Sequence, residues 1–399
     1  MRFVPIAILW LLLDTYVAKG IATATSGWSN FSSGLVLSIY WLSDLALIAA
    51  IFYSFNKGDF RRGKSSNTLM GFTILSIVPK LFTFIFFLIE DFTRLIRGIF
   101  SEIPARNVIY SEFTLTIAGL IFIGIIYGLL KGKHSYRLHR IKLDFKDLPD
   151  AFHGFTITQL SDIHSGSFTN ANGVEKGIEL ANKQKSDIIV FTGDLVNNTA
   201  DEMTPWINTF AKLEAKLGKF SVLGNHDYGD YVAWHSAEAK AANLHRLKEV
   251  HREIGFRLLL NENIKIEKNG QAISLLGVEN WGKRGFAQYG DLNAALNGTK
   301  ERDFKILLSH DPSHWEGQIL HHPNPVHLTL SGHTHGMQFG FERFGFKWSP
   351  IKYIYKQWAG AYQKVEKYLY VNRGFGFLGF PGRVGILPEI TVIELVKAG

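Results

Sequence analysis

The chain has 399 residues, so its length suggests two or three domains. It contains no cysteine, which excludes disulfide bonds, thiolate metal ligands and a cysteine nucleophile. A formal net charge of +8 is compatible with phosphate-bearing substrates, nucleic acid or an anionic membrane surface. Apolar residues concentrate in the first third of the chain, whereas the rest has the character of a soluble enzyme.

Four apolar segments in the first third are long enough to cross a bilayer, which takes about 20 residues. They are Phe3–Ile21, Leu35–Phe55, Leu69–Ile89 and Phe113–Leu130. A secretory signal peptide is the alternative for the first segment, but it shows no clear small-residue cleavage site and three more spans follow. We therefore predict a transmembrane region of about four helices over residues 1–130.

Basic residues in the loops predict the orientation of these spans. The loop 56–64 and the run 131–142 are rich in Lys and Arg, whereas the loop 22–34 carries no charge. The positive-inside rule then places both chain ends in the cytoplasm. We expect a multi-pass protein of the bacterial inner membrane with a cytoplasmic C-terminal part. Residues 131–149 are interpreted as a basic linker attracted to anionic lipid headgroups rather than to nucleic acid.

Two features of the apolar third leave alternatives open. Apolar residues at helical spacing over 92–103 predict either an amphipathic interfacial helix or a continuation of the third span. Asp14, Asp44 and Lys80 fall inside predicted spans, where charges usually face the interior of a bundle. They either pair with one another, which we favour, or line a polar path or lipid site.

From about residue 150 onward, short apolar runs alternate with amphipathic stretches, which predicts a layered α/β domain over 150–399. Helices are expected over 174–183, 203–217 and 233–254, and a hairpin over 264–278 around Asn269-Gly270. Further strands are expected over 155–160, 187–192, 220–223, 304–308, 326–330, 368–371 and 390–395.

Polar clusters follow five of these strands. They are Asp162-Ile163-His164, Gly193-Asp194, Gly224-Asn225-His226-Asp227, His310-Asp311 and Gly332-His333-Thr334-His335. Because sites form at the carboxyl ends of strands, clusters far apart in sequence can converge. Carboxylate, imidazole and amide oxygen suit Mn, Fe or Zn, and the set is too large for one ion. Two divalent ions sharing a bridging carboxylate fit it, with Asp194 as the natural bridge.

Five segments of residues 150–399 resemble the calcineurin-like metallophosphoesterase superfamily. They are Ser161–His164, Thr192–Asn197, Leu223–Tyr228, Ser309–Pro312 and Ser331–His335. Tyr370–Gly376 and Pro388–Thr391 resemble a bacterial membrane-associated phosphodiesterase branch within it. The resemblance implies a four-layer α/β/β/α sandwich with two mixed sheets, here preceded by the four-helix transmembrane region.

The resemblance also implies a role for each motif residue. One ion would be held by Asp162, His164, Asp194 and His335, and the other by Asp194, Asn225, His310 and His333. His226 would act as leaving-group acid or charge stabiliser, and Asp227 would orient His226 by hydrogen bonding. A hydroxide bridging the two ions would attack the phosphorus.

Three features carry weaker predictions. Asn197 either contacts a substrate phosphate or stabilises a turn. Arg373 either binds a phosphate or diphosphate as a bidentate donor or forms a surface ion pair. The Gly- and Phe-rich stretch 374–380 is either a buried loop or a segment that dips into the lipid headgroups.

We therefore expect a membrane-anchored phosphoesterase that cleaves a phosphodiester or diphosphate bond of an amphipathic or lipid-linked substrate. A UDP-2,3-diacylglucosamine diphosphatase of lipid A synthesis is an alternative within the enzymes. A non-catalytic membrane scaffold is the alternative outside them. Nucleic acid is not an expected partner, because the basic residues concentrate beside the membrane region rather than around the motifs.

Overall fold

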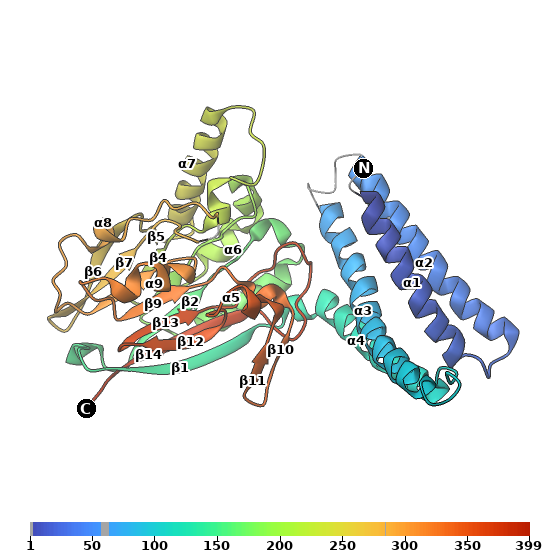
Figure 1. The fold of residues 1–399 in the computed structure, drawn as a ribbon. Helices are drawn as coiled ribbons and strands as arrows, with labels where there is room; N and C mark the ends of the chain where they lie inside the picture. Colours follow the sequence, from blue (N-terminus) through green and yellow to red (C-terminus); the bar gives the residue numbers. More distant parts are fainter. Residues whose placement is uncertain (1–2, 57–63, 284) are drawn as a thin grey trace. The chain divides into compact units, whose positions relative to one another are not determined.

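The computed structural model describes residues 3–56, 64–283 and 285–399 (Figure 1). The chain divides into two compact units. The first comprises Met1–Leu130 together with Gly379–Gly382, and the second comprises Lys131–Leu378 and Arg383–Gly399. Most of the basic loop predicted over 56–64 lies outside the described residues.

The first unit consists of four long helices. They are α1 (Phe3–Ala24), α2 (Asn30–Asn56), α3 (Lys64–Gly98) and α4 (Val108–Leu130). All four are long and apolar enough to cross a membrane, and each contains one of the predicted spans. Because α3 continues to Gly98, residues 92–98 extend the third span instead of forming a separate interfacial helix.

Charged side chains link three of these helices. Lys80 on α3 forms an ion pair with Asp14 on α1, with 2.7 Å between Nζ and Oδ1, and a second ion pair with Asp44 on α2. The Tyr40 hydroxyl donates to Asp14 at 3.1 Å, and the Ser76 hydroxyl donates to Asp44 at 2.7 Å. The prediction that the intramembrane charges pair with one another is therefore confirmed.

The second unit is built on two six-stranded sheets. The first sheet has the order β1-β14-β2-β3-β4-β5 and the second has the order β12-β13-β9-β8-β7-β6. The strands of the first are β1 (Arg137–Phe145), β14 (Glu389–Lys397), β2 (Phe155–Leu160), β3 (Ile188–Phe191), β4 (Lys219–Ser221) and β5 (Arg257–Leu258). Those of the second are β12 (Gly360–Lys364), β13 (Lys367–Val371), β9 (Leu328–Ser331), β8 (Lys305–Leu308), β7 (Gln271–Gly277) and β6 (Glu262–Lys268). A separate hairpin pairs β10 (Phe341–Arg343) with β11 (Phe346–Trp348).

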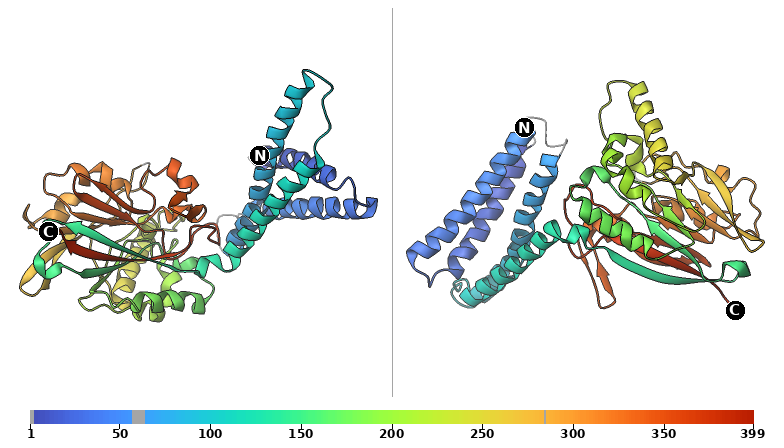
Figure 2. Two further views of the ribbon diagram at one scale, coloured as in Figure 1. Left: turned by 90° about the horizontal axis from the view of Figure 1, so that it is seen from below. Right: turned by 180° about the vertical axis from the view of Figure 1, so that it is seen from behind.

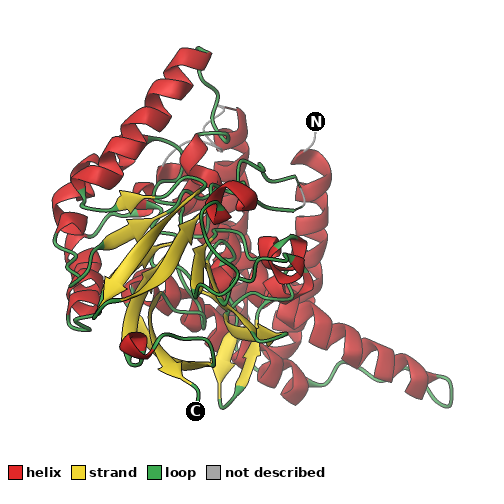
Figure 3. Ribbon diagram, turned by 90° about the vertical axis from the view of Figure 1, so that its left-hand side faces the viewer, coloured by secondary structure: helices red, strands yellow, loops and turns green. Residues whose placement is uncertain are grey.

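Alternating side chains in these strands build a layered core. In β3, Ile188 and Val190 enter the core between the two sheets, whereas Ile189 and Phe191 enter the core beneath the helices of the first sheet. Those helices are α5 (Ala171–Asn182), α6 (Ile207–Ala211) and α7 (Ala237–Glu253). The short helices α8 (Leu292–Leu296) and α9 (Ser313–Gly317) cover the second sheet (Figures 2 and 3). The predicted α/β/β/α sandwich is confirmed.

Strand β1 corrects the interpretation of residues 131–149 as a linker. Residues 137–145 pair in parallel with the whole of β14, and Leu143 and Phe145 are buried in the core between the sheets. The strand escaped detection because its outward positions carry charged residues, among them Arg140 and Lys142. Such charges are common on edge strands, where they discourage pairing with other chains.

Two further expectations need adjustment. The helix predicted over 203–217 is a 3-10 turn, η5 (Ala200–Trp206), followed by the short α6. Pro205 explains this break, because proline disfavours α-helical backbone at the residue before it.

In the stretch 374–380, Phe375 and Phe377 are buried in the core beneath the helices of the first sheet. The buried-loop interpretation therefore holds for these two side chains, and the membrane-contact interpretation is wrong for them.

Candidate metal centre

The loops after five strands carry the site. Asp162 and His164 follow β2, Asp194 follows β3, and Asn225 opens the 3-10 turn η6 (Asn225–Tyr228) after β4. The remaining three predicted ligands are His310 after β8 and His333 and His335 after β9. The structure brings all seven side chains together in two neighbouring groups.

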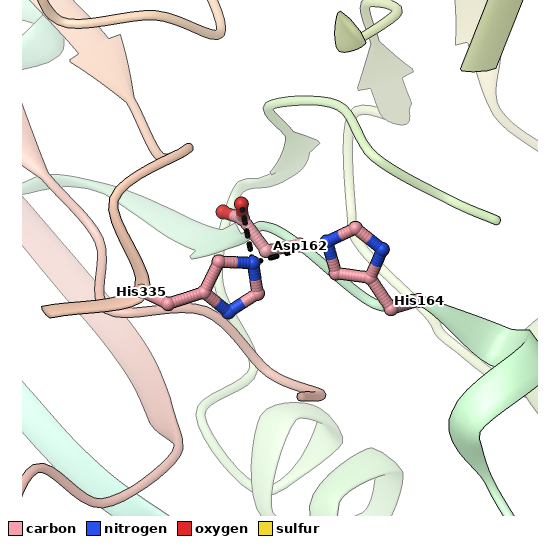
Figure 4. Close-up of side chains that lie close together, drawn as sticks. All are labelled: Asp162, His164 and His335. Atoms are coloured by element: carbon pink, nitrogen blue, oxygen red, sulfur yellow. Dashed lines mark hydrogen bonds and ion pairs between the residues drawn. The ribbon is translucent and has the colours of Figure 1, made fainter. Parts of the chain in front are cut away.

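The first group contains Asp162, His164 and His335, all buried (Figure 4). The Nε2 atoms of His164 and His335 lie 3.0 Å apart, and the Nε2 atom of His335 lies 3.2 Å from Asp162 Oδ1. Ligand atoms that sit about 2.0–2.2 Å from one ion are roughly 3 Å from their neighbours in the coordination shell. The three side chains therefore have the spacing of ligands to a single ion.

The second group contains Asp194, His310, His333 and Asn225. Asp194 Oδ2 lies 3.2 Å from His310 Nε2, and Asn225 Oδ1 lies 3.1 Å from His310 Nε2 and 2.8 Å from His333 Nδ1. The Asn225 amide nitrogen donates to the Tyr231 hydroxyl at 2.8 Å. That bond turns the amide oxygen toward the histidines, as metal binding requires.

Asp194 lies between the two groups. Its Oδ2 atom is 3.5 Å from His164 Nε2 and 3.2 Å from His310 Nε2. Its other oxygen, Oδ1, accepts a hydrogen bond from the His226 backbone nitrogen at 2.9 Å. One carboxylate oxygen is thus directed at both groups, which is the position of a bridging ligand.

The protonation states also suit cation binding. Burial lowers the pKa of His164 to about 3 and lowers the pKa of His333, so both imidazoles are neutral, which is the ligating form. Burial alone would lower the pKa of His310 too, but the Asp194 carboxylate outweighs it and raises that pKa to about 10. The site therefore attracts positive charge in the absence of a metal. The donor set fits divalent ions.

The backbone is held in an unusual conformation throughout the site. Five predicted ligands adopt left-handed backbone, with φ of 51° at Asp162, 48° at His164, 62° at Asp194, 70° at His333 and 51° at His335. Such strain is uncommon outside glycine and clusters at functional sites. At Gly332, a Cβ would lie 1.9 Å from the Ser161 hydroxyl oxygen, so only glycine fits at the head of this motif.

Asp227 has a different role from the one predicted. Its Oδ2 accepts from the backbone nitrogens of Asp194 and Gly224 at 2.9 and 2.8 Å. Its Oδ1 accepts from Leu195 at 2.8 Å and Val196 at 3.3 Å. The prediction that Asp227 orients His226 is wrong, because the carboxylate instead ties the loop after β3 to the loop after β4.

The backbone of Asn197 orients His226. The His226 Nδ1 atom lies 2.7 Å from the Asn197 carbonyl oxygen, and because a carbonyl can only accept, Nδ1 carries the hydrogen. The Nε2 atom is the remaining ring nitrogen, and His226 lines a cavity of about 490 Å³ beside the metal groups. The Asn197 side chain donates to the Ser167 hydroxyl at 3.1 Å and does not line this cavity. This bond fits the alternative in which the Asn197 side chain stabilises its own loop region, and the substrate contact stays a prediction.

Arg373 is not at the site. Its guanidinium is buried and pairs with two carboxylates, with Nη1 donating to Glu389 at 2.6 Å and Nε donating to Glu342 at 2.9 Å. The predicted phosphate contact is wrong, and the ion pair considered as its alternative is present, although inside the protein rather than on its surface.

Besides Tyr231, sequence reasoning missed Arg383 and Tyr355, which also contact predicted ligands. Arg383 is fully buried, with Nη2 3.2 Å from His335 Nδ1. The Tyr355 hydroxyl lies 2.9 Å from His333 Nε2 and donates to Asp311 at 3.3 Å. Neither residue belongs to a recognisable motif, so only the tertiary structure identifies them.

Comparison with known proteins agrees with this geometry. A family model described as "Probable Calcineurin-like phosphoesterase, transmembrane domain" matches residues 1–133, and one described as "Calcineurin-like phosphoesterase" matches residues 155–337. The chain is 31% identical over 300 residues to the uncharacterized metallophosphoesterase YkuE of Bacillus subtilis, covering 74% of this chain and 98% of that one.

Two other relatives extend into the membrane region. A transmembrane protein with metallophosphoesterase domain from Danio rerio is 27% identical over 83% of this chain and 74% of its own length. An uncharacterized metallophosphoesterase of Campylobacter jejuni is 25% identical over 88% of this chain and 87% of its own length. The chain therefore belongs to the calcineurin-like metallophosphoesterase family and combines its phosphoesterase domain with an N-terminal four-helix transmembrane domain.

Proposed function

We propose that this protein is a membrane-anchored phosphoesterase that holds two divalent ions and hydrolyses a phosphodiester or diphosphate bond. The observation that carries the proposal is the Asp194 carboxylate, one oxygen of which lies within 3.5 Å of a histidine nitrogen from each group. Two ions that share a ligand are close enough to act on one phosphoryl group.

We propose one ligand set for each ion, on the basis of these two groups. The first set is Asp162, His164, Asp194 and His335, and the second is Asp194, Asn225, His310 and His333. Their mixture of imidazole, carboxylate and amide oxygen suits Mn, Fe or Zn. When bound, the ions would neutralise charge on the phosphoryl oxygens and acidify the attacking water.

His226 supplies the proton chemistry in this proposal. Its Nδ1–H is held by the Asn197 carbonyl, which fixes the ring and leaves Nε2 to exchange a proton. Its backbone nitrogen donates to Asp194, so the backbone that carries the ring is fixed to the shared carboxylate. From this position, we propose, Nε2 protonates the leaving oxygen, a role typically worth about 10²–10⁴-fold in rate.

We propose an amphipathic or lipid-linked substrate. The cavity beside the site is polar where His164, Asp194 and His226 line it. The apolar side chains of Ile351, Ile354 and Leu378 also line it. A phosphate ester with an apolar group matches both kinds of side chain, and the transmembrane domain tethers the chain where such molecules reside.

The direct test is hydrolysis of bis(p-nitrophenyl) phosphate by the full chain in detergent, with Mn²⁺ and with a chelator. Asp194→Asn should lose both bound metal and turnover, because it removes the shared charge. His226→Ala should keep two ions but lose about 10²–10⁴-fold in turnover. His245→Ala, at an exposed histidine on α7, is the matched control. Metal content is measured by mass spectrometry, and full turnover by Asp194→Asn would contradict the proposal.

We further propose that the phosphoesterase domain faces the cytoplasm, on the strength of the basic run 131–142 next to α4. A fluorescent reporter fused after Gly399 should be active, since it folds in the cytoplasm. A reporter that works only outside the cytoplasm should be inactive at the same position, and the reverse pattern would overturn the assignment.

A further inference from the structure

Exposed apolar side chains of the second unit concentrate in one segment. Among its described residues, six large apolar side chains at least 44% exposed lie within residues 337–354, and three others are scattered elsewhere. The six are Met337, Phe341, Phe344, Phe346, Tyr353 and Ile354. An exposed apolar cluster of this kind marks an interaction surface rather than ordinary surface.

The β10–β11 hairpin carries the centre of this cluster and projects from the sheets (Figure 1). Phe344 forms its tip and is 96% exposed. Phe341 pairs with Trp348 and Phe346 pairs with Arg343, so Phe341 and Phe346 are diagonal neighbours, with their ring centroids 6.1 Å apart. The hairpin thus presents three exposed rings, of which Phe344 at the turn is the most exposed.

Basic residues accompany the apolar residues of this segment. Arg343, Lys352 and Lys356 are exposed, whereas the ammonium group of the exposed Lys347 donates to the Ala359 carbonyl and the Tyr362 hydroxyl. The single acidic residue between positions 337 and 356 is Glu342, whose carboxylate pairs with the buried Arg373. Aromatic side chains flanked by Lys and Arg match the boundary of a bilayer, where rings enter the headgroup layer and cations meet anionic lipids.

We propose that residues 337–354 form a membrane-contacting surface, with the rings of Phe341, Phe344 and Phe346 inserted into the headgroup region of an anionic bilayer. The chain itself supplies the argument for this partner. The fourth transmembrane helix ends at Leu130 and β1 begins at Arg137. Six intervening residues span at most about 22 Å, so a bilayer is always within reach of the unit.

The same segment continues into the wall of the metal site. After β11 the chain forms the 3-10 turn η9 (Pro350–Tyr353) and reaches Tyr355, whose hydroxyl contacts His333. Ile351 and Ile354 line the cavity beside the site. A lipid that enters along the hairpin therefore meets an apolar wall leading to the metal groups. This second step rests on the proposed phosphoesterase function.

The absence of cysteine gives a clean test, since one introduced thiol can be labelled alone. Phe344→Cys and Val365→Cys are each labelled with an environment-sensitive fluorophore in the full chain, one copy per lipid nanodisc. Val365 is the matched control, because it is 84% exposed and lies at the tip of the β12–β13 hairpin with φ of 48°, close to the 56° of Phe344. We expect blue-shifted emission and quenching by headgroup-proximal nitroxide lipids at position 344 only.

Other results would overturn the proposal. Emission at position 344 typical of water, or equal lipid quenching at both positions, would remove the special role of the hairpin. Protection of position 344 from an aqueous quencher without lipid quenching would mean that a protein surface covers it. Replacing anionic by zwitterionic lipid should weaken the quenching, because the cations of Arg343, Lys352 and Lys356 lose their anionic partners.

A turnover assay tests the link to the site. Phe344→Ser should lower hydrolysis of a vesicle-embedded phosphodiester by about tenfold, because it weakens interfacial binding, and should leave bis(p-nitrophenyl) phosphate hydrolysis unchanged. Equal loss on both substrates would overturn the link. If the unaltered protein hydrolyses neither substrate, the proposed function fails, whereas the fluorescence result stands independently.

Discussion

Both oxygens of the buried Asp227 carboxylate are occupied by backbone amides of two loops of the metal centre. In Asp227→Asn, one oxygen becomes an amino group that cannot accept, so at least one buried N–H loses its partner. We expect a loss of about 1–3 kcal/mol in unfolding free energy and weaker metal binding. Thermal unfolding and metal content check this, with Asp201→Asn at an exposed carboxylate as control. An altered pH–rate profile with unchanged metal affinity would instead restore the predicted role in orienting His226.

His251 on α7 gives a pH-dependent prediction. Burial lowers the pKa of His251 to about 3, so the folded state stays unprotonated at a pH where the unfolded state, with a pKa near 6.5, binds a proton. Stability therefore falls as the pH drops below about 6.5, at about 1.4 kcal/mol per pH unit for this group.

Replacing His251 by Leu removes that proton uptake from the unfolded state. The unfolding temperature of the variant should fall less steeply between pH 6 and 4 than that of the unaltered protein. The exposed His245→Leu is the control and should leave the slope unchanged. Identical slopes for both variants would contradict the assignment of His251 as a buried neutral imidazole.

Polar clusters after strands pointed to a metal site, and the family resemblance then assigned the candidate ligands within those clusters. The two arginines show where that reasoning ends. Arg373 directly follows β13 and looked like a phosphate donor, yet it pairs with Glu389. Arg383 lies ten residues later in the same Gly-rich segment and contacts His335. The two arginines lie in similar Gly-rich sequence. Only their long-range packing shows which of them contacts a candidate metal ligand.

At the scale of elements, α1, α2 and α3 depend on one buried cation. Lys80→Met would leave Asp14 and Asp44 without their counter-ion in an apolar bundle. Removing one partner of a buried ion pair typically costs about 3–5 kcal/mol. Asp14→Asn should cost less, because Lys80 keeps Asp44 as its partner.

Thermal unfolding in one detergent should therefore rank Lys80→Met below Asp14→Asn in stability. The triple replacement of Asp14, Asp44 and Lys80 by neutral residues is the control and should recover much of the loss. A Lys80→Met protein as stable as the unaltered one would show that the ion pairs do not hold the helices together.

Elements with a regular apolar period were predicted well. Strand β2 begins and ends at the predicted residues, and α5, α7 and β13 lie close to their predicted ranges. Strand β1 was missed because charged residues at its outward positions obscured the alternation of its inward-facing side chains. The pairing of β1 with β14 joins residues about 250 positions apart, and no local pattern encodes such a contact.

At the scale of the whole molecule, the boundary between the units predicts which fragment folds. A fragment 131–399 retains β1, whereas 150–399 exposes one edge of β14 and removes the buried Leu143 and Phe145. We expect the longer fragment to be soluble and monodisperse and the shorter one to aggregate, because an uncovered apolar strand edge pairs with other chains. Size-exclusion chromatography of both fragments checks this, and a monodisperse 150–399 would contradict the structural role of β1.

Strand β14 is the last strand of the chain, yet it lies between β1 and β2, the first two strands of its sheet. A ribosome therefore delivers the transmembrane helices first and the strand that supports the Asp162 loop last. Until residues 389–397 emerge, β2 lacks its neighbour and the metal centre cannot be complete. An interrupted polypeptide would be inserted in the membrane without a completed candidate metal site, so membrane insertion precedes completion of that site during biosynthesis.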